Sequence, residues 1–358
     1  MYRERVRIWR ELWLILTAIG AAWLVVPTPN QWVETVYSRK IFPAFAGVIV
    51  RVFDLVPFSV AGVFLIVTLI LLIFLIFQLW RSRRFRFGKA GFGKARLDLL
   101  WRVPLGLLAF YGLFILLWGA NYRRLPIEDL LKLRVNAVTA QQIDILASDL
   151  VSVMQQNANA PLDRARAFAS LRAALETQVE GINGFKPVLP SQVKSPPAGW
   201  LLLLETSGVI SPLTLEAHVD AALPEPFFLA TATHELAHTA GFAGEADTDL
   251  LAALAGLRAG DAYARYATAI TYYTRISGDV SDAVRKRLAL KLPLRALEDF
   301  KLLRRAYAAH QNPVAAQVSR SVYNKYLESQ GVSAGIRDYS RITRLLAAAW
   351  SPDRFFEK

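Results

Sequence analysis

The sequence predicts a membrane-anchored, mainly α-helical protein, with three N-terminal transmembrane helices followed by a mostly helical domain that contains a short β element. Long uncharged apolar runs occur only in the first 120 of the 358 residues. This part contains 15 Lys and Arg against 5 Asp and Glu, whereas the remainder contains 27 against 24. Helix-capping residues and helical periodicity then recur to the end of the chain. The sequence therefore predicts two regions, 1–120 and 121–358.

The first region is expected to cross the membrane three times. The predicted spans are about 8–27, 57–80 and 103–120. The second is the strongest, because residues 60–77 are uncharged and apolar over a length that crosses a bilayer. Since no clean cleavage site follows the first span, we expect an uncleaved anchor.

Positive charges predict the orientation of these spans. Arginines precede the first span, and a basic loop at 81–102 follows the second. Both are expected on the cytoplasmic side by the positive-inside rule. The basic excess thus indicates membrane orientation and excludes nucleic acid as the expected partner. The sequence predicts a multi-pass protein of the inner (cytoplasmic) membrane, in contact with the lipid bilayer, with residues 121–358 in the periplasm or outside the cell.

The second region is expected to be mainly helical. Predicted helices cover about 139–155, 161–179, 261–276, 281–290, 294–310 and 312–330. Short strands are predicted at 200–205 and 213–219, the second just before the most informative motif. There is no cysteine, which excludes disulfides and thiolate metal sites.

That motif is His234-Glu235-Leu236-Ala237-His238, in a chain with only four histidines. Histidines at i and i+4 lie on one helical face, so both imidazoles can bind one metal ion. Glu235 lies next to that face, where it can accept a proton from water activated by the metal and return it to a leaving amine. A core-packed histidine pair is the simpler alternative, but the residues that follow also fit a metal site.

Those residues supply carboxylates at the start of a second helix. Two glycines, Gly241 and Gly244, allow the chain to reverse, and Glu245, Asp247 and Asp249 follow. Catalytic Zn²⁺ takes three protein ligands, and two histidines with one glutamate are a known set. We predict Glu245 as the third ligand, with Asp247 as the alternative. Asp249 is predicted to accept a hydrogen bond from a ligand histidine, with Asp247 also a supporting residue.

The pattern Glu-x-x-x-Asp resembles the second motif of gluzincin metallopeptidases, although the spacing from His238 is much shorter here. The whole chain resembles the bacterial membrane proteins grouped as domain of unknown function 3810. The resemblance rests on Pro57-Phe58-Ser59, the run 211–217, the HExxH segment with Gly241-Phe242-Ala243 and Glu245, and the segment 322–327 before Tyr339. It implies that residues 121–358 form an extracytoplasmic zincin-like metallopeptidase domain.

The expected function is hydrolysis of peptide bonds in a peptide or protein substrate. Through the tail segment of the resemblance, Tyr323 and Tyr339 are candidates for stabilising the oxyanion, as are tyrosines within 263–273. The predicted strand at 213–219, just before the helix that carries His234 and His238, is expected to pair with the substrate. His218 is not expected to be a ligand. The alternative is a catalytically inactive binding or scaffold module of the cell envelope, but a structural metal site does not require Glu235.

Overall fold

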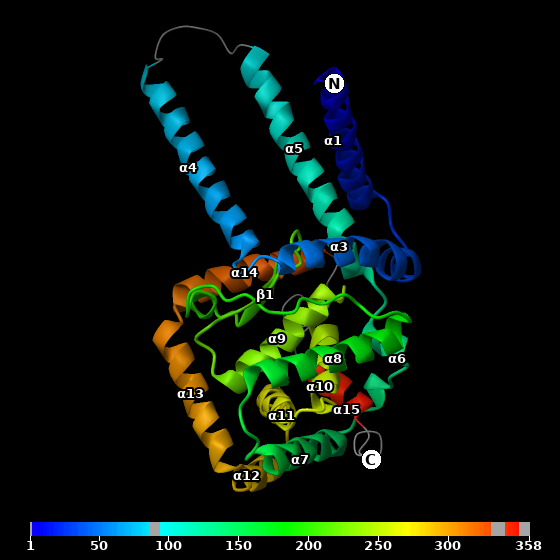
Figure 1. Ribbon diagram of the computed structural model, residues 1–358, viewed down its shortest axis with the longest axis vertical. Helices are drawn as coiled ribbons and strands as arrows, with labels where there is room; N and C mark the ends of the chain where they lie inside the picture. The colour runs from blue at the N-terminus through cyan, green and yellow to red at the C-terminus, as the bar shows by residue number, and fades with distance from the viewer. Residues whose placement is uncertain (1, 86–93, 331–340, 351–358) are drawn as a thin grey trace.

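The computed structural model describes residues 2–85, 94–330 and 341–350, and over these residues the chain is mainly helical (Figure 1). Three long helices project from one side of a helical domain. They are α1 (Tyr2–Val25), α4 (Val60–Phe85) and α5 (Lys94–Leu117). The prediction of a mainly helical chain with long apolar N-terminal helices is therefore confirmed.

Two of the projecting helices are long and apolar enough to cross a membrane. The stretches are Ile8–Val25 in α1 and Val60–Gln78 in α4, and almost none of their residues are buried. The third predicted span falls on α5, whose apolar stretch Arg102–Leu117 is shorter. Helix α5 ends at Leu117, and Trp118 and Ala120 after it are buried. Part of the predicted basic loop, residues 86–93, lies outside the described residues.

Helices α1 and α5 pack closely against each other because each contains a glycine at the contact. A side chain on Gly112 would collide with the backbone carbonyl of Leu16, and one on Gly20 would collide with that of Leu108. Small residues of this kind let two apolar helices approach at backbone distance. Helix α4 behaves differently, since none of Val60–Gln78 is buried and the helix stands apart from the α1–α5 pair (Figure 1).

A continuous helical segment follows α1 and lies between the projecting helices and the domain. It consists of α2 (Asn30–Trp32), the π-helical η1 (Val33–Ile41) and α3 (Phe42–Asp54). Its apolar face packs with the end of α5 and with two loops of the domain, in a cluster of Val33, Tyr37, Phe42, Ala46, Val50, Ile115, Trp118, Ala120, Leu215 and Ala243. This cluster joins the projecting helices to the domain.

The domain is organised around α9 (Glu225–Thr239), which is buried on every side from Pro226 to Thr239. Helices α8 (Arg164–Asn183), α10 (Glu245–Leu257) and α11 (Ala262–Ile276) pack directly against it. Helix α7 (Ala140–Asn157) packs on α11, and α15 (Ile342–Ala349) packs on α10. Thr139 begins α7 with a capping box, at the predicted start of the helix at 139–155. A helix enclosed in this way holds its side chains in fixed positions.

The remaining helices lie around this core. They are η2 (Gly119–Arg123), α6 (Ile127–Leu131), η3 (Val135–Ala137), η4 (Leu202–Leu204), α12 (Asp282–Ala289), α13 (Leu294–His310) and α14 (Pro313–Ser329). The predicted helices 281–290, 294–310 and 312–330 agree with α12, α13 and α14 to within a residue or two. Helix α14 runs crosswise at the end of the domain from which the long helices project (Figure 1).

The β element is smaller than predicted and uses partly different residues. Strands β1 (Gly208–Ile210) and β2 (Ala217–Val219) pair antiparallel, with Val209 opposite His218. The predicted strand at 213–219 is formed only from Ala217 onward, because Leu215 has a φ of 52° and its N–H bonds back to the carbonyl of Ser211. The prediction missed β1.

The predicted strand at 200–205 is wrong. The carboxylate of Asp220 accepts hydrogen bonds from the backbone N–H groups of Gly199, Leu201 and Leu202. These bonds hold the segment in a turn that contains η4 rather than in an extended conformation. A carboxylate twenty residues away thus overrides the local strand preference of the leucines.

Candidate metal centre

Helix α9 brings His234 and His238 together on one face. The helix begins after Pro224, with Pro226 in its first turn, where the missing N–H of proline has no cost. The two imidazoles are one turn apart, and their ring centroids lie 4.8 Å from each other. Both side chains are buried. The predicted histidine pair is therefore present at the centre of the domain.

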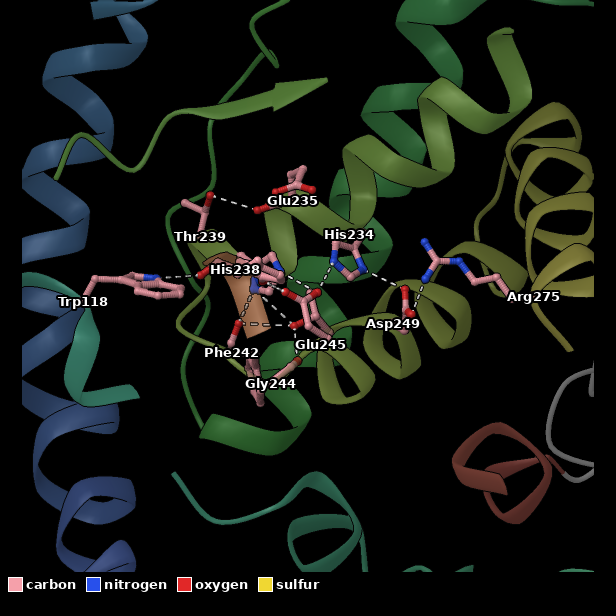
Figure 2. A network of polar contacts seen from close by, with 12 residues as sticks. Trp118, His234, Glu235, His238, Thr239, Phe242, Gly244, Glu245, Asp249 and Arg275 are labelled. Carbon is pink, nitrogen blue, oxygen red and sulfur yellow. Dashed lines mark hydrogen bonds and ion pairs between the residues drawn. The ribbon is translucent and has the colours of Figure 1, made fainter. Parts of the chain in front are cut away.

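Glu245, the first residue of α10, faces this pair (Figure 2). Gly241, with a φ of 90°, ends α9 and turns the chain back. The Oε2 atom of Glu245 then lies 3.2 Å from Nε2 of His234 and 3.5 Å from Nε2 of His238. Ligands about 2.0–2.2 Å from a tetrahedral ion lie roughly 3.3–3.5 Å from one another. The three buried side chains could therefore hold a metal ion.

The other nitrogen of each imidazole already has an acceptor. Nδ1 of His234 lies 2.7 Å from Oδ1 of Asp249, and Nδ1 of His238 lies 2.7 Å from the carbonyl oxygen of Phe242. An acceptor at Nδ1 places the proton there and leaves Nε2 free as a ligand. Both Nε2 atoms point toward Glu245, so the tautomers suit a cation held between the three side chains.

Asp249 is in turn held by Arg275 from α11. The guanidinium group of Arg275 donates to Oδ2 of Asp249, and the hydroxyl of Tyr272 lies 3.4 Å from Oδ1. Burial alone would raise the pKa of Asp249, but Arg275 and His234 lower it below the usual range. Asp249 is therefore a carboxylate that orients His234, in the position predicted for it. Arg275 itself was not predicted.

Two buried carboxylates, those of Glu245 and Asp249, determine the electrostatics of the centre. Burial would raise the pKa of Glu245, but the two histidines lower it well below the usual range. Burial disfavours a charged His234, yet Asp249 and Glu245 raise its pKa to about 10. Each carboxylate is thus ionised and attracts a proton or another cation to the imidazoles. Such a set of donors is suited to a divalent metal ion.

Glu235 lies beside the group but is not part of it (Figure 2). Its side chain is buried, and among the described residues its Oε2 has no hydrogen-bond partner. Burial and the nearby charges of Glu245 and Asp249 raise the pKa of Glu235 to about 7, although both histidines oppose this. An unpaired buried carboxylate of this kind is typical of a group that exchanges protons.

A cavity of about 620 Å³ opens onto these side chains. Glu235, Glu245 and both histidines line one wall, and β1 lines another. At Gly208 of β1, a Cβ atom would lie only 2.5 Å from Oε1 of Glu235 and 2.7 Å from Thr231. Only glycine lets β1 pass this close to Glu235. The role of Gly208 was not predicted, because nothing in the neighbouring sequence distinguishes it from a glycine in a loop.

The residues just after α5 form a further wall of the cavity. Trp118 and Tyr122 line it, and the indole Nε1 of Trp118 donates to the carbonyl oxygen of His238 over 3.3 Å. Tyr326 of α14 packs edge-on against Tyr122. Aromatic residues at the end of an apolar span are typical of a membrane interface, but Trp118 and Tyr122 instead line the cavity.

Of the remaining predicted site residues, Tyr323 contacts the metal group, whereas Asp247 is not part of it. The hydroxyl of Tyr323 donates to Oε1 of Glu245, so this tyrosine of α14 is at the centre. Tyr339 lies outside the described residues. Asp247 is not in the group of His234, His238 and Glu245, and one of its oxygens lies 3.8 Å from Arg341. The structure thus favours Glu245 over Asp247 as the third candidate ligand.

His218 is also outside the metal group. Its Nε2 lies 2.7 Å from the hydroxyl of Ser59, and its Nδ1 faces the carbonyl of Val209. Burial lowers the pKa of His218. This histidine joins β2 to the start of α4.

Comparison with known proteins identified a family but no function. A family model described as "Protein of unknown function (DUF3810)" matches residues 37–347. The match covers the end of η1, all of the domain up to α15 and both segments of the centre. No curated protein and no solved structure matches the chain.

Proposed function

The chain belongs to the DUF3810 family, and we propose that it is a membrane-anchored, zincin-like metallopeptidase that hydrolyses peptide bonds. The observation that carries this proposal is the position of Glu235. A buried carboxylate lines a cavity directly beside three side chains that could hold a metal ion, and one of its oxygens has no hydrogen-bond partner in the described part of the chain. A metal site that served stability alone would have no use for such a group.

Zn²⁺ is the ion that we propose for the site. Two imidazoles and one carboxylate are a ligand set of catalytic zinc, and they leave one position for water or substrate. The ion would supply an activated water and polarise the carbonyl group to be attacked. The second-sphere contacts of Asp249 and Phe242 support this, since they fix both Nε2 atoms toward one point.

The protein side chains would carry the proton during hydrolysis. Glu235 would accept a proton from the attacking water while the water oxygen bonds to the carbonyl carbon. Glu235 would then donate this proton to the amide nitrogen as the C–N bond breaks, which yields a carboxylic acid and an amine. Tyr323, whose hydroxyl donates to Glu245 from α14, would stabilise the oxyanion.

The free edge of β1 supports a peptide as substrate. In the register of the β1–β2 pair, Ser207, Val209 and Ser211 face β2 with their backbone groups. The N–H and C=O groups of Gly208 and Ile210 therefore point away from β2. β1 also lines the cavity beside Glu235. An extended peptide can pair with such an edge through its main chain, which places a peptide bond near the metal site.

The test uses the full-length protein purified in detergent, with His234→Ala and Glu235→Gln as variants. We expect about one zinc per chain in the wild type and in Glu235→Gln, and none in His234→Ala. The wild type should cleave peptides in a random-sequence library, and Glu235→Gln should cleave them at least about 100-fold more slowly.

Two results would overturn the proposal. The first is wild-type protein that contains no metal as purified and whose folding a chelator does not affect. The second is a Glu235→Gln protein that binds metal and cleaves peptides as fast as the wild type. If metal is bound but no peptide is cleaved, the alternative of an inactive binding module is favoured.

A further inference from the structure

One wall of the cavity is a direct continuation of α5. Trp118 immediately follows the last residue of this helix and is hydrogen-bonded to the backbone of His238. Phe114, within α5, packs edge-on against Tyr326 of α14, with ring centroids 6.4 Å apart. Tyr326 also lines the cavity. The projecting helix and the metal centre are thus part of one packed unit.

The opposite wall is joined to α4. β1 pairs with β2, and β2 and the residue before it hold the first turn of α4. The backbone N–H groups of Val60 and Ala61 donate to the carboxylate of Glu216, at 2.9 and 2.7 Å. Ser59, just before α4, is bonded to His218 of β2. The cavity therefore lies between the points at which α4 and α5 enter the domain.

Helix α4 offers a free apolar surface above this cavity. None of Val60–Gln78 is buried, whereas α1 and α5 cover each other. Among the described residues, nothing covers this apolar helix, whose candidate span has 19 residues. A helix of about 20 apolar residues fits the length of another membrane span.

Exposed apolar residues also occur on α14 and on the lining of the cavity. On α14, Val314, Val318 and Val322 are more than half exposed and lie four residues apart, in one stripe. Leu204 and Val209, which line the cavity, are 40% and 44% exposed. Exposed apolar residues gathered at one site are typical of a surface that meets lipid or another apolar partner.

From these contacts we infer that the substrate is itself a membrane-anchored polypeptide. Its membrane span lies beside α4, and the segment that directly adjoins this span enters the cavity along β1. This inference rests on the proposed function and specifies its substrate class. The continuity of both cavity walls with α4 and α5 sets the position of the cut, close to the membrane and not at a distance from it.

The test compares three synthetic probes with the full-length protein in phospholipid vesicles. One probe joins a Leu/Ala span of about 20 residues directly to a window of about 10 randomised residues, which reaches about 30 Å when extended. The second places a flexible Gly/Ser linker of about 30 residues between the span and the window. The third is the window alone. The first two are equally concentrated in the membrane, so only the position of the window differs.

Binding is measured separately from hydrolysis. The chain has no cysteine, so a cysteine that replaces Val209 in the Glu235→Gln background can carry a single photo-cross-linker. A cysteine at Leu290, which is 91% exposed and lies just after α12, is the matched control. We expect Val209→Cys to capture the adjoining window at least about tenfold more than the displaced or free window, and Leu290→Cys to capture none selectively.

The outcomes separate this inference from the proposed function. Equal capture of the three windows, or capture of none, would overturn the inference. Wild-type cleavage of the free or displaced window without preference for the adjoining one would also overturn it and leave the peptidase in place. Selective capture of the adjoining window without any cleavage by the wild type would overturn the peptidase and leave a module that binds the same segment.

Discussion

The Nδ1 atom of His234 and the Oδ1 atom of Asp249 are 2.7 Å apart, although the residues belong to successive helices and are 15 positions apart. Asp249 is fully buried and receives a second charged contact from Arg275. The contact orients the imidazole so that its Nε2 faces Glu245. A histidine ligand that is held in this way binds metal more tightly than a free one.

We predict that Asp249→Ala weakens Zn²⁺ binding by about 10- to 100-fold, because His234 loses the acceptor that orients it. Competition with a chromogenic chelator measures the affinity. Asp247→Ala, in the same turn of α10, is the matched control and should leave the affinity unchanged. If Asp247→Ala abolished binding and Asp249→Ala did not, the assignment of Glu245 and Asp249 would be wrong.

Gly208→Ala should abolish hydrolysis while metal binding is kept. The added Cβ would lie 2.5 Å from Oε1 of Glu235, so either this carboxylate or β1 has to move. The metal group is formed by residues of α9 and α10, none of them from β1, and is expected to remain. The measurements are zinc content and peptide cleavage by the same preparation. Gly181→Ala, where a Cβ has open space in α8, should behave like the wild type.

Tyr323→Phe should lower kcat by about 100-fold with little change in KM, if its hydroxyl stabilises the oxyanion. Zinc content has to be measured beside it, because Tyr323 also donates to Glu245. Tyr326→Phe is the matched control: it lies one turn away on α14 and stacks on Tyr323 with centroids 6.1 Å apart. An equal loss in both variants would indicate that α14 is needed for packing and that Tyr323 has no chemical role.

The sequence predicted the parts of the centre that local spacing determines. His234, Glu235 and His238 follow from helical periodicity alone, and Gly241 marks the end of their helix. Glu245 and Asp247 could not be separated in the sequence, because both lie in the first turn of α10. The angle at which α10 packs against α9 decides between them, and that angle depends on contacts spread over the whole core.

Predictions failed where distant residues override local preference. The leucines at 201–204 favour a strand, but Asp220 captures their backbone N–H groups. Trp118 has the signature of an interface residue, yet it is 2% exposed and bonded to His238. Asp220 is distant in sequence from the leucines that it binds, and His238 is distant from Trp118. The same holds for Arg275, which contacts Asp249 but lies 26 residues from it in the sequence.

A last prediction concerns the ion pair of Glu34 and Arg124, which links η1 to the loop between α9 and α10 that contains Gly241. Nε of Arg124 lies 2.8 Å from Glu34, and Nη1 donates to the carbonyl of Gly241 at 3.0 Å. Burial alone would raise the pKa of Glu34, but Arg124 and Arg39 lower it below 4.5. Because the folded-state pKa is below the unfolded value, the pair stabilises the folded state above about pH 4.5, and this stabilisation is lost as the pH falls through the folded-state pKa.

Glu34→Gln should therefore reduce the free energy of unfolding by about 3 kcal/mol at pH 7, since Arg124 remains buried without its charged partner. The difference between wild type and variant should shrink as the pH falls below 4.5. Denaturant unfolding of the metal-free, full-length protein, followed by tryptophan fluorescence from pH 7 to pH 3, measures it. Asp282→Asn removes an exposed ion pair with Arg285 on α12 and should have no measurable effect. If the difference in unfolding free energy between wild type and Glu34→Gln stayed constant over this pH range, the carboxylate charge would not be what holds η1 to the Gly241 loop.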